Sequence, residues 1–284
     1  MNTPTMKLVH KQRLRAHFGL TGVPFRKNVH ARRMFDSSSQ RDLGHGLRMW
    51  LEVQGLALVV GSTGVGKSIS IRRFTEELDD ARHKAIRLNR APSTPTGFLR
   101  SLNRTLGLPM RRYASDLFDQ AREHLTSYAE THGPHPVILL DNAEGMKPAT
   151  LDLVRRLTHW ELDSVDRFSV LIVGTEELLR TLRLQQLSSL RSRFSYTCSL
   201  SPFSLEDTRN YIRYHLEGAG AQKDLITDEA ARAIFMAAEG APRRINQLAV
   251  QALIQAAVTG RDQLDGQFLV ELIKSHPLFG RGER

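Results

Sequence analysis

The amino-acid sequence predicts an α/β fold, in which a parallel five-stranded sheet has helices on both faces and is followed by a small all-helical domain. Short, continuous apolar runs alternate with long segments of helical period through the first two-thirds of the 284 residues. This alternation is typical of buried parallel strands joined by crossover helices. A glycine-rich loop follows the first run, which places a tight turn at the end of a strand. Beyond residue 203 no strand-like run occurs, so the remaining chain is expected to be helical.

Five apolar runs are the expected strands. Four are clear and the fifth is weaker: Leu56–Val60, Ala85–Leu88, Val137–Leu140, Ser169–Val173 and Thr197–Leu200. They are continuous rather than alternating, as expected for strands buried on both faces. Two helix starts are predicted between them, at Thr94 before Pro95 and at Ser115, because Ser and Thr are common N-caps and Pro favours the first helical position.

Four helices are expected in the last third of the chain: Ser204–Gly220, Thr227–Gly240, Pro242–Gly260 and Asp265–Ser275. Ser204, Thr227 and Asp265 are the predicted N-caps, and three of the four segments end in Gly. The predicted domains are therefore a basic N-terminal segment with an opening motif (1–35), an α/β core (36–203), a helical domain (204–275) and a loose tail (276–284).

The chain is strongly basic, with a net charge of +10 and a pI near 10.2. Eight of the 40 basic residues are Lys, which leaves 32 Arg. A surplus of this size favours a polyanionic partner, most often nucleic acid. A surplus that serves only solubility is the alternative.

Cysteine content and hydropathy predict a cytoplasmic protein. The single cysteine, Cys198, excludes an internal disulfide framework and fits a reducing compartment. The first residues lack the apolar core of a signal peptide, and no apolar run approaches the roughly 18 residues of a membrane span. We therefore expect no membrane partner.

The strongest motif is LALVVGSTGVGKS, residues 56–68, in which an apolar strand leads into Gly61-x-x-x-x-Gly66-Lys67-Ser68. Such a loop points backbone N–H groups at phosphate oxygens, and the following helix adds its positive N-terminal end. Lys67 is expected to reach the β- and γ-phosphates of ATP, and Ser68 to bind Mg²⁺. The expected ATP-binding residues of the loop are Gly61, Ser62, Thr63, Gly64, Val65, Gly66, Lys67, Ser68 and Ile69.

A second acidic motif is VILLDNAEG, residues 137–145. Asp141 ends an apolar strand, where it is expected to bring a carboxylate to the Mg²⁺. Asn142 follows, and an amide cannot accept the proton of an attacking water, so hydrolysis is expected to be slow. Glu144 is a candidate substitute base; the alternatives are an ordinary surface acid or a salt-bridge partner for Lys147.

These motifs together resemble an AAA+ ATPase of the initiator-like group, and most of all the transposition regulators of the TnsC/MuB type and the similar ExeA-like proteins. The matching motifs follow family order over residues 17–260: HFGLTGVPF (17–25), Phe35-Asp36-Ser37, the phosphate loop, the acidic strand, Ser169–Val173 with Gly174-Thr175, LSSLRSRF (187–194) and Gly240-Ala241-Pro242-Arg243-Arg244. The departure is Asp141-Asn142-Ala143-Glu144, where the family has Asp-Glu-Ala-Gln or Asp-Glu-Ala-His.

The resemblance implies a P-loop AAA+ module with a helical lid, and ATP bound between neighbouring subunits. It assigns the polar position after the fourth strand to Thr175. Arg191 or Arg193 would be an arginine finger that reaches the γ-phosphate in the next subunit, and Arg243 would contact the phosphates from the lid. Phe25 would pack near the adenine, or serve only as a buried anchor.

Basic residues between the second and third strands are the candidate DNA contacts: Arg90, Arg100, Arg104, Arg111 and Arg112, with Lys147 nearby in the sequence. In initiator-like ATPases a helical insertion in this region lines the DNA. Such phosphate contacts are independent of base sequence and sensitive to salt. A solvated basic face is the alternative.

The sequence thus predicts an ATP-dependent regulator of transposition that binds double-stranded DNA without sequence preference. Copies would assemble head-to-tail as a ring or helical filament, mark target DNA, and recruit a transposase with or without a target-selection adaptor. The alternatives are an ExeA-like secretion ATPase and an assembly or signalling NTPase with no DNA role. Binding of DNA that requires ATP would separate the first from the others.

Overall fold

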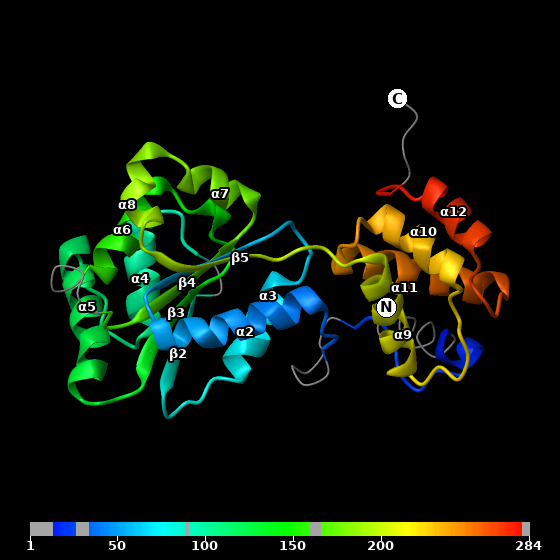
Figure 1. The fold of residues 1–284 in the computed structure, drawn as a ribbon, viewed down its shortest axis with the longest axis horizontal. Helices are drawn as coiled ribbons and strands as arrows, with labels where there is room; N and C mark the ends of the chain where they lie inside the picture. Colours follow the sequence, from blue (N-terminus) through cyan, green and yellow to red (C-terminus); the bar gives the residue numbers. More distant parts are fainter. Residues whose placement is uncertain (1–13, 27–33, 89–90, 160–165, 280–284) are drawn as a thin grey trace, which may run out of the picture. The chain divides into compact units, whose positions relative to one another are not determined.

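A computed structural model of the protein describes residues 14–26, 34–88, 91–159 and 166–279 (Figure 1). The chain divides into two compact units. The sheet unit comprises residues 38–63 and 67–201, and the helical unit comprises residues 1–37, 64–66 and 202–284. No helix of the described ranges is both long and apolar enough to cross a membrane.

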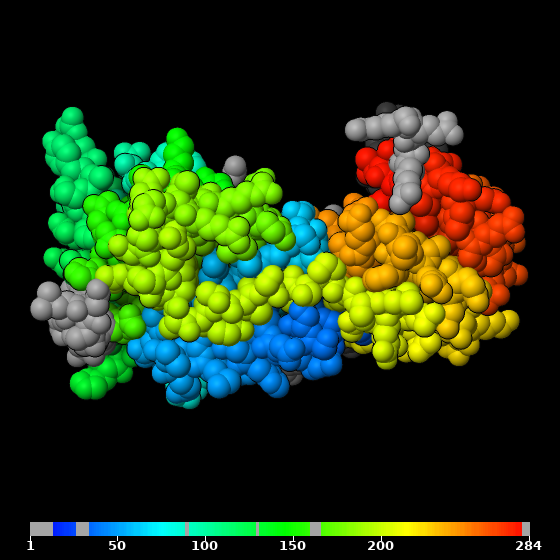
Figure 2. Space-filling view, turned by 45° about the horizontal axis from the view of Figure 1, so that its top comes forward, coloured from blue at the N-terminus to red at the C-terminus, as the bar shows by residue number. Residues whose placement is uncertain are grey.

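The sheet unit contains the predicted parallel five-stranded sheet, in the order β2-β3-β4-β1-β5. Its strands are β1 (Leu56–Val60), β2 (His83–Leu88), β3 (His135–Leu140), β4 (Ser169–Gly174) and β5 (Phe194–Ser199). The fifth strand begins earlier than predicted and ends before Leu200. Its residues alternate between partly buried and exposed, because β5 lies at the edge of the sheet, so it lacks the continuous apolar signature. In Figure 2 its yellow-green atoms lie on the surface beside the blue atoms of α2.

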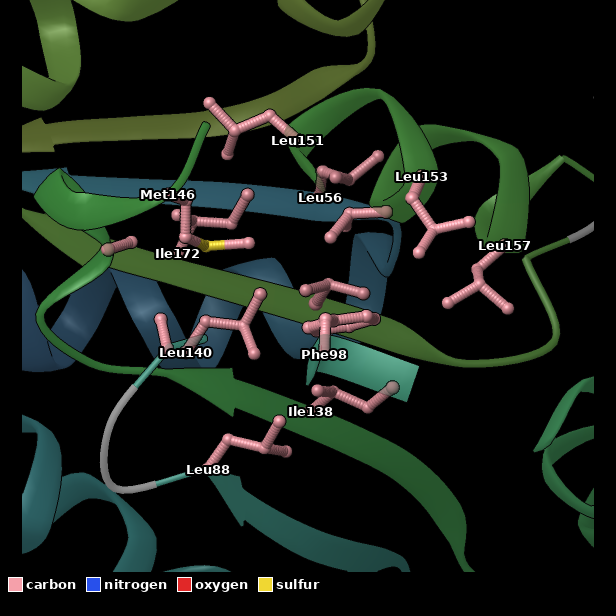
Figure 3. Close-up of a cluster of buried hydrophobic side chains, with 14 of the residues drawn as sticks. Leu56, Leu88, Phe98, Ile138, Leu140, Met146, Leu151, Leu153, Leu157 and Ile172 are labelled. Atoms are coloured by element: carbon pink, nitrogen blue, oxygen red, sulfur yellow. The ribbon is translucent and has the colours of Figure 1, made fainter. Parts of the chain in front are cut away.

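Helices cover both faces of the sheet (Figure 1). They are α2 (Ser38–Val53), α3 (Lys67–Glu76), α4 (Pro95–Thr105), α5 (Ala114–Glu130), α6 (Pro148–Thr158), α7 (Glu176–Leu182) and α8 (Ser188–Arg191), with short 3-10 turns η2 (Ala143–Gly145) and η4 (Gln185–Leu187). Alternate strand residues such as Leu140 and Ile172 pack with Phe98 of α4 and Leu151 of α6 in one apolar cluster (Figure 3). Each such buried side chain stabilises the fold by about 2 kcal/mol.

The two predicted helix starts of this unit have different outcomes. Thr94 is the N-cap of α4, and its side chain accepts a hydrogen bond from the Gly97 N–H at 3.3 Å. The prediction for Ser115 is wrong, because α5 begins at Ala114. The Leu117 N–H donates to the Tyr113 carbonyl at 3.2 Å, so Tyr113 occupies the capping position.

The helical unit contains the four expected helices: α9 (Leu205–Glu217), α10 (Asp228–Ala238), α11 (Pro242–Thr259) and α12 (Gly266–Ser275). The three predicted N-caps are confirmed by hydrogen bonds from backbone N–H groups to the side chains of Ser204, Thr227 and Asp265. Ser204 and Asp207 also form a reciprocal capping box. The caps therefore fix where three of these helices begin.

Both ends of the described chain pack into this unit. Phe18, Leu20 and Phe25 are buried in its apolar core, and the Thr21 N–H donates to the Ala219 carbonyl at 2.9 Å. At the other end, His276 and Phe279 pack against this unit, whereas Pro277 and Leu278 are exposed. His276 is 9% exposed, and its Nε2 lies 2.8 Å from Gln251 Oε1 of α11. The rest of the predicted tail, 280–284, lies outside the described residues.

Candidate nucleotide site

The phosphate loop joins the end of β1 to the start of α3. Gly64 and Gly66 have φ angles of +88° and +109°, a backbone conformation that other residues rarely adopt. The ammonium of Lys67 donates to the carbonyls of Gly61 (2.7 Å) and Ser62 (3.0 Å). The loop thus curves around its own lysine at the N-terminus of a helix, a geometry suited to a bound anion.

The acidic strand β3 is separated from β1 by β4. Since all strands are parallel, Asp141, Thr175 and the phosphate loop follow the carboxyl ends of neighbouring strands. The carboxylate of Asp141 accepts a hydrogen bond from the N–H of Asn142 at 2.9 Å. The backbone carbonyl of Asp141 accepts one from the N–H of Ala91 at 3.1 Å. This second bond ties the segment that precedes α4 to the end of the acidic strand.

Asn142 is exposed and has a left-handed backbone, with φ 56° and ψ 47°. Asn adopts this conformation more readily than most residues that carry a Cβ, because its short amide bonds locally. The residue at this position therefore makes the turn that starts η2.

Glu144 lies in the middle of that 3-10 turn, which carries its carboxylate back over β4. A Cβ added at Gly174 would lie 3.3 Å from Glu144 Oε2. Within the described residues, Glu144 Oε2 and Thr175 Oγ1 are buried and have no hydrogen-bond partner. A buried oxygen without a partner costs about 1 to 3 kcal/mol, which a bound water or phosphate oxygen would offset.

Glu144 and Thr175 line a pocket of about 310 Å³ together with Thr63 of the phosphate loop. The other lining residues are Glu176, Glu177 and Arg180, which sequence reasoning missed. They stand on α7, which begins directly after Thr175. In the sequence they appear as two adjacent Glu residues with an Arg one turn later. This group comes directly after a strand that ends at the carboxyl edge of the sheet. The pocket places a carboxylate and a hydroxyl beside the loop, where they can hold a water.

The two candidate arginine fingers have different surroundings. Arg191, at the end of α8, donates through Nη1 to the carbonyls of Leu182, the last residue of α7, and Leu184, just before η4. Arg193 Nη2 lies 3.2 Å from the Nδ1 of His159. Arg191 therefore stabilises its own unit, whereas the guanidinium of Arg193 contacts a side chain at the surface.

Two further candidates belong to the helical unit. Arg243 is the second residue of α11 and is exposed, directly after the buried Pro242. Phe25 is 5% exposed and packs against the rings of Tyr211 and His215, with centroids 6.4 and 5.0 Å away. Burial of this kind favours the alternative in which Phe25 is an apolar anchor.

Four of the candidate DNA contacts are on one helical hairpin. Arg100 and Arg104 are exposed on α4, and Arg111 and Arg112 are exposed in the turn before α5. Lys147 is exposed. It lies at the opposite end of α4, because its N–H donates to the carbonyl of Ser93, just before that helix starts. A helix of 11 residues separates the two ends by about 16 Å. Arg90 lies outside the described residues.

The residues at the loop fit ATP with Mg²⁺. Among the residues with described structure, no group of three or more His, Cys, Asp or Glu side chains is placed to hold a metal by itself. A cation would therefore rely on the Ser68 hydroxyl, the Asp141 carboxylate and the oxygens of the phosphates, which is how Mg²⁺ is usually held beside a nucleotide.

The phosphate loop, the intervening strand β4 and the acidic strand are arranged as in a P-loop nucleotide-binding fold. Consistent with this, residues 51–182 match the family model described as AAA domain. General secretion pathway protein A of Aeromonas hydrophila is 30% identical over 254 residues, which are 87% of this chain and 45% of that protein. The chain thus spans a little under half the length of this relative.

Solved structures share the fold. The ORC2 protein of Aeropyrum pernix, in ADPNP and ADP complexes, superposes with a TM-score of 0.63 at 15% identity, over 88% of this chain and 71% of that one. Cdc6p of Pyrobaculum aerophilum gives 0.58 at 20% identity, over 88% and 67%. The ORC1 protein of Aeropyrum pernix in complex with DNA gives 0.57 at 16% identity, over 94% and 72%. The protein therefore has the AAA+ fold of the ORC and Cdc6 proteins.

Proposed function

We propose that this protein is an ATP-dependent regulator of transposition that binds duplex DNA in the cytoplasm. Copies of the chain would assemble head-to-tail on DNA with ATP between them, and the assembly would mark target DNA for a transposase. A target-selection adaptor would be a further partner. Such head-to-tail contacts either close into a ring or continue as a filament.

The observation that carries the proposal is the connection between the acidic strand and the basic hairpin. The Asp141 carbonyl accepts the Ala91 N–H, and the Ser93 carbonyl accepts the Lys147 N–H (3.1 Å) and the Thr150 hydroxyl (2.7 Å). Two residues of the segment before α4, Ala91 and Ser93, are therefore hydrogen-bonded to residues that follow β3. A change at Asp141 when nucleotide binds would shift the helix that presents Arg100 and Arg104.

Hydrolysis would depend on the pocket beside the loop. When bound, ATP would supply the phosphoryl group and Mg²⁺ would neutralise the charge of its phosphates. Lys67 would hold the phosphates, Ser68 and Asp141 would hold the cation, and Glu144 with Thr175 would orient a water. Arg193 or Arg191 would complete the site from a neighbouring subunit. Because Asn142 replaces the usual acid, turnover would be slow, which suits a mark that persists until its partner arrives.

A second candidate is an assembly ATPase of the secretion type without a DNA role. The 30% identity with General secretion pathway protein A favours it. The basic hairpin supports the first candidate, since four exposed arginines on one hairpin suit a polyanion.

The experiment is a binding assay with a labelled duplex, in ATP analogue, in ADP and without nucleotide, over a range of salt. The proposed function predicts binding that needs ATP and weakens with salt. The charge reversal Arg111→Glu with Arg112→Glu should weaken it and leave nucleotide affinity unchanged. The matched control reverses two exposed arginines of the helical unit, Arg213→Glu with Arg232→Glu.

Negative-stain images of the same samples test the assembly. Rings or filaments on DNA with the ATP analogue are expected, and single particles with ADP. A protein that remains monomeric and ignores DNA in every nucleotide state would exclude the first candidate, and partition into membrane fractions would favour the second.

A further inference from the structure

The turn between α4 and α5 is held by two side-chain amides. Asn103 of α4 is completely buried and donates through Nδ2 to Leu99 O (2.8 Å) and Leu117 O (2.9 Å). Its Oδ1 accepts from Nε2 of Gln120, on α5, at 2.8 Å. Gln120 Nε2 also donates to Pro109 O inside the turn, at 2.9 Å. The turn is therefore anchored to the interior of the hairpin.

The oxygen of Gln120 makes one further bond, which reaches the basic surface. Gln120 Oε1 accepts from Arg111 Nε at 3.0 Å. A guanidinium has five N–H donors, and this bond uses the one on Nε. The four donors on Nη1 and Nη2 are at the outer end of the group, in the fork that matches two phosphate oxygens. Because Arg111 is exposed, Gln120 rather than packing sets its direction.

The rest of the turn is an ordered surface. The Leu108 N–H donates to the Asn103 carbonyl at 2.9 Å, within the same anchor. The guanidinium carbon of Arg112 lies 5.7 Å from the centroid of the Tyr113 ring, which is 60% exposed. Arg111 and Arg112 are thus each in contact with a neighbouring side chain, Gln120 and Tyr113 respectively.

We propose that Gln120 is a positioning residue that presets the Arg111 guanidinium for a two-pronged contact with one phosphate of duplex DNA. The inference rests on the proposed function. A mobile basic turn also attracts phosphate, but its side chains must be ordered on binding, and that ordering weakens the complex. The anchored turn has this order before DNA arrives.

The test is a double-mutant cycle on the full chain, read as affinity for a labelled duplex in ATP analogue at several salt concentrations. Gln120→Met keeps the length of the side chain and removes its amide. We expect it to weaken binding roughly 3- to 10-fold, the value of one ordered side chain at an interface. Arg111→Ala should also lower the salt slope by about 1, the effect of one lost phosphate contact.

In the Arg111→Ala background, Gln120→Met should have no further effect, because its influence passes through Arg111. Gln267→Met is the matched control, since Gln267 makes a side-chain bond to Glu271 in the helical unit. Losses that add in the double variant, or unchanged binding by Gln120→Met, would overturn the positioning role and leave DNA binding intact. A wild-type protein that does not bind DNA would overturn both proposals.

A second variant covers the case in which Gln120→Met does not fold. Arg111→Lys keeps the charge but has neither the fork nor the Nε donor. It should weaken binding by a similar factor with an unchanged salt slope. Equal affinity of the Arg111→Lys and wild-type proteins would overturn the inference.

Discussion

Glu144 and Thr175 line the same pocket, and each contributes a buried oxygen that has no hydrogen-bond partner among the residues of described structure. Native proteins leave few such groups, because each costs about 1 to 3 kcal/mol. Both residues lie next to Thr63 of the phosphate loop. The pair is therefore arranged for an occupant that supplies hydrogen bonds, and a water beside the terminal phosphate of ATP would do so.

Glu144→Gln tests whether this carboxylate acts as the base. The amide has the same shape but accepts no proton, so we expect turnover to fall by about 10²-fold or more, with unchanged ATP affinity. Single-turnover hydrolysis and nucleotide binding are the measurements. The control is Glu123→Gln, on the exposed surface of α5. Unchanged turnover would remove Glu144 from the mechanism.

Asn142→Glu tests whether the missing acid limits the rate. We expect turnover to rise, since general-base assistance is typically worth about 10² to 10⁴, although the left-handed backbone at 142 would reduce the gain. Asn142→Gln is the matched control, because it has the same length and the same backbone strain without the charge. Equal ATPase rates for the two variants would show that residue 142 does not set the rate.

Gly174→Ala should disturb the packing of the residues that line the pocket. The new Cβ would lie 2.7 Å from Leu178 Cδ2 and 3.3 Å from Glu144 Oε2, so the Leu178 side chain and the Glu144 carboxylate must shift. We expect a loss of about 1 to 3 kcal/mol in the free energy of unfolding, together with slower hydrolysis. Gly145→Ala is the control, since its Cβ would meet no atom within 4 Å. Similar denaturation midpoints for the two variants would contradict this packing.

Arg191 and Arg193 should separate into a structural and a functional role. Arg191 donates to the carbonyls of Leu182 and Leu184, at the end of α7 and just beyond it, so Arg191→Ala should lower the melting temperature. Arg193→Ala should instead lower turnover by about 10³-fold, as expected for a trans arginine, with a smaller change in melting temperature. An Asp141→Asn protein is inactive in its own site but retains Arg193. Adding it to the Arg193→Ala protein should partly restore turnover. Failure of this mixing experiment would exclude a contribution in trans.

Stability should decrease between about pH 6.5 and pH 4. Burial lowers the pKa of His135 to about 4, with help from His83, and burial lowers the pKa of His215 to about 4. In the unfolded chain these groups bind protons near pH 6.5, so acid favours unfolding across this window, and the stability they contribute is complete above it. Urea unfolding at pH 7.5 and pH 5 measures the difference.

His135→Asn should make the unfolding of the sheet unit less sensitive to pH in that window, and His132→Asn, in the preceding exposed turn, serves as the control. The same pH dependence in both variants would show that His135 is not responsible.

The sequence predicted the fold because its strong signals are local. Buried central strands require continuous apolar runs, and the side chains of Ser204, Thr227 and Asp265 cap the first turns of their own helices. Edge strand β5 lacks a continuous apolar run because alternate residues face water, so the sequence predicts too late a start for it. Ser115 has the residue type of an N-cap, but the Tyr113 carbonyl accepts the first hydrogen bond of the helix.

The site was less accessible to sequence reasoning because it depends on directions in space. Spacing alone left open whether Glu144 turns toward the loop or away from it, and η2 decides this. The pocket residues of α7 follow a strand end in the sequence, but only the placement of β4 between β1 and β3 brings them beside the phosphate loop. The bond from Gln120 to Arg111 spans nine residues across a turn, so no periodicity indicates it.

The burial of Phe18, Leu20 and Phe25 beneath α9 and its neighbours has a consequence for synthesis on the ribosome. These side chains are synthesised before most of their buried packing partners, which lie between residues 203 and 272. At about 5 to 20 residues per second, the early segment waits roughly 10 to 40 s with its aromatic rings uncovered. A chaperone that holds nascent chains would have its natural target there.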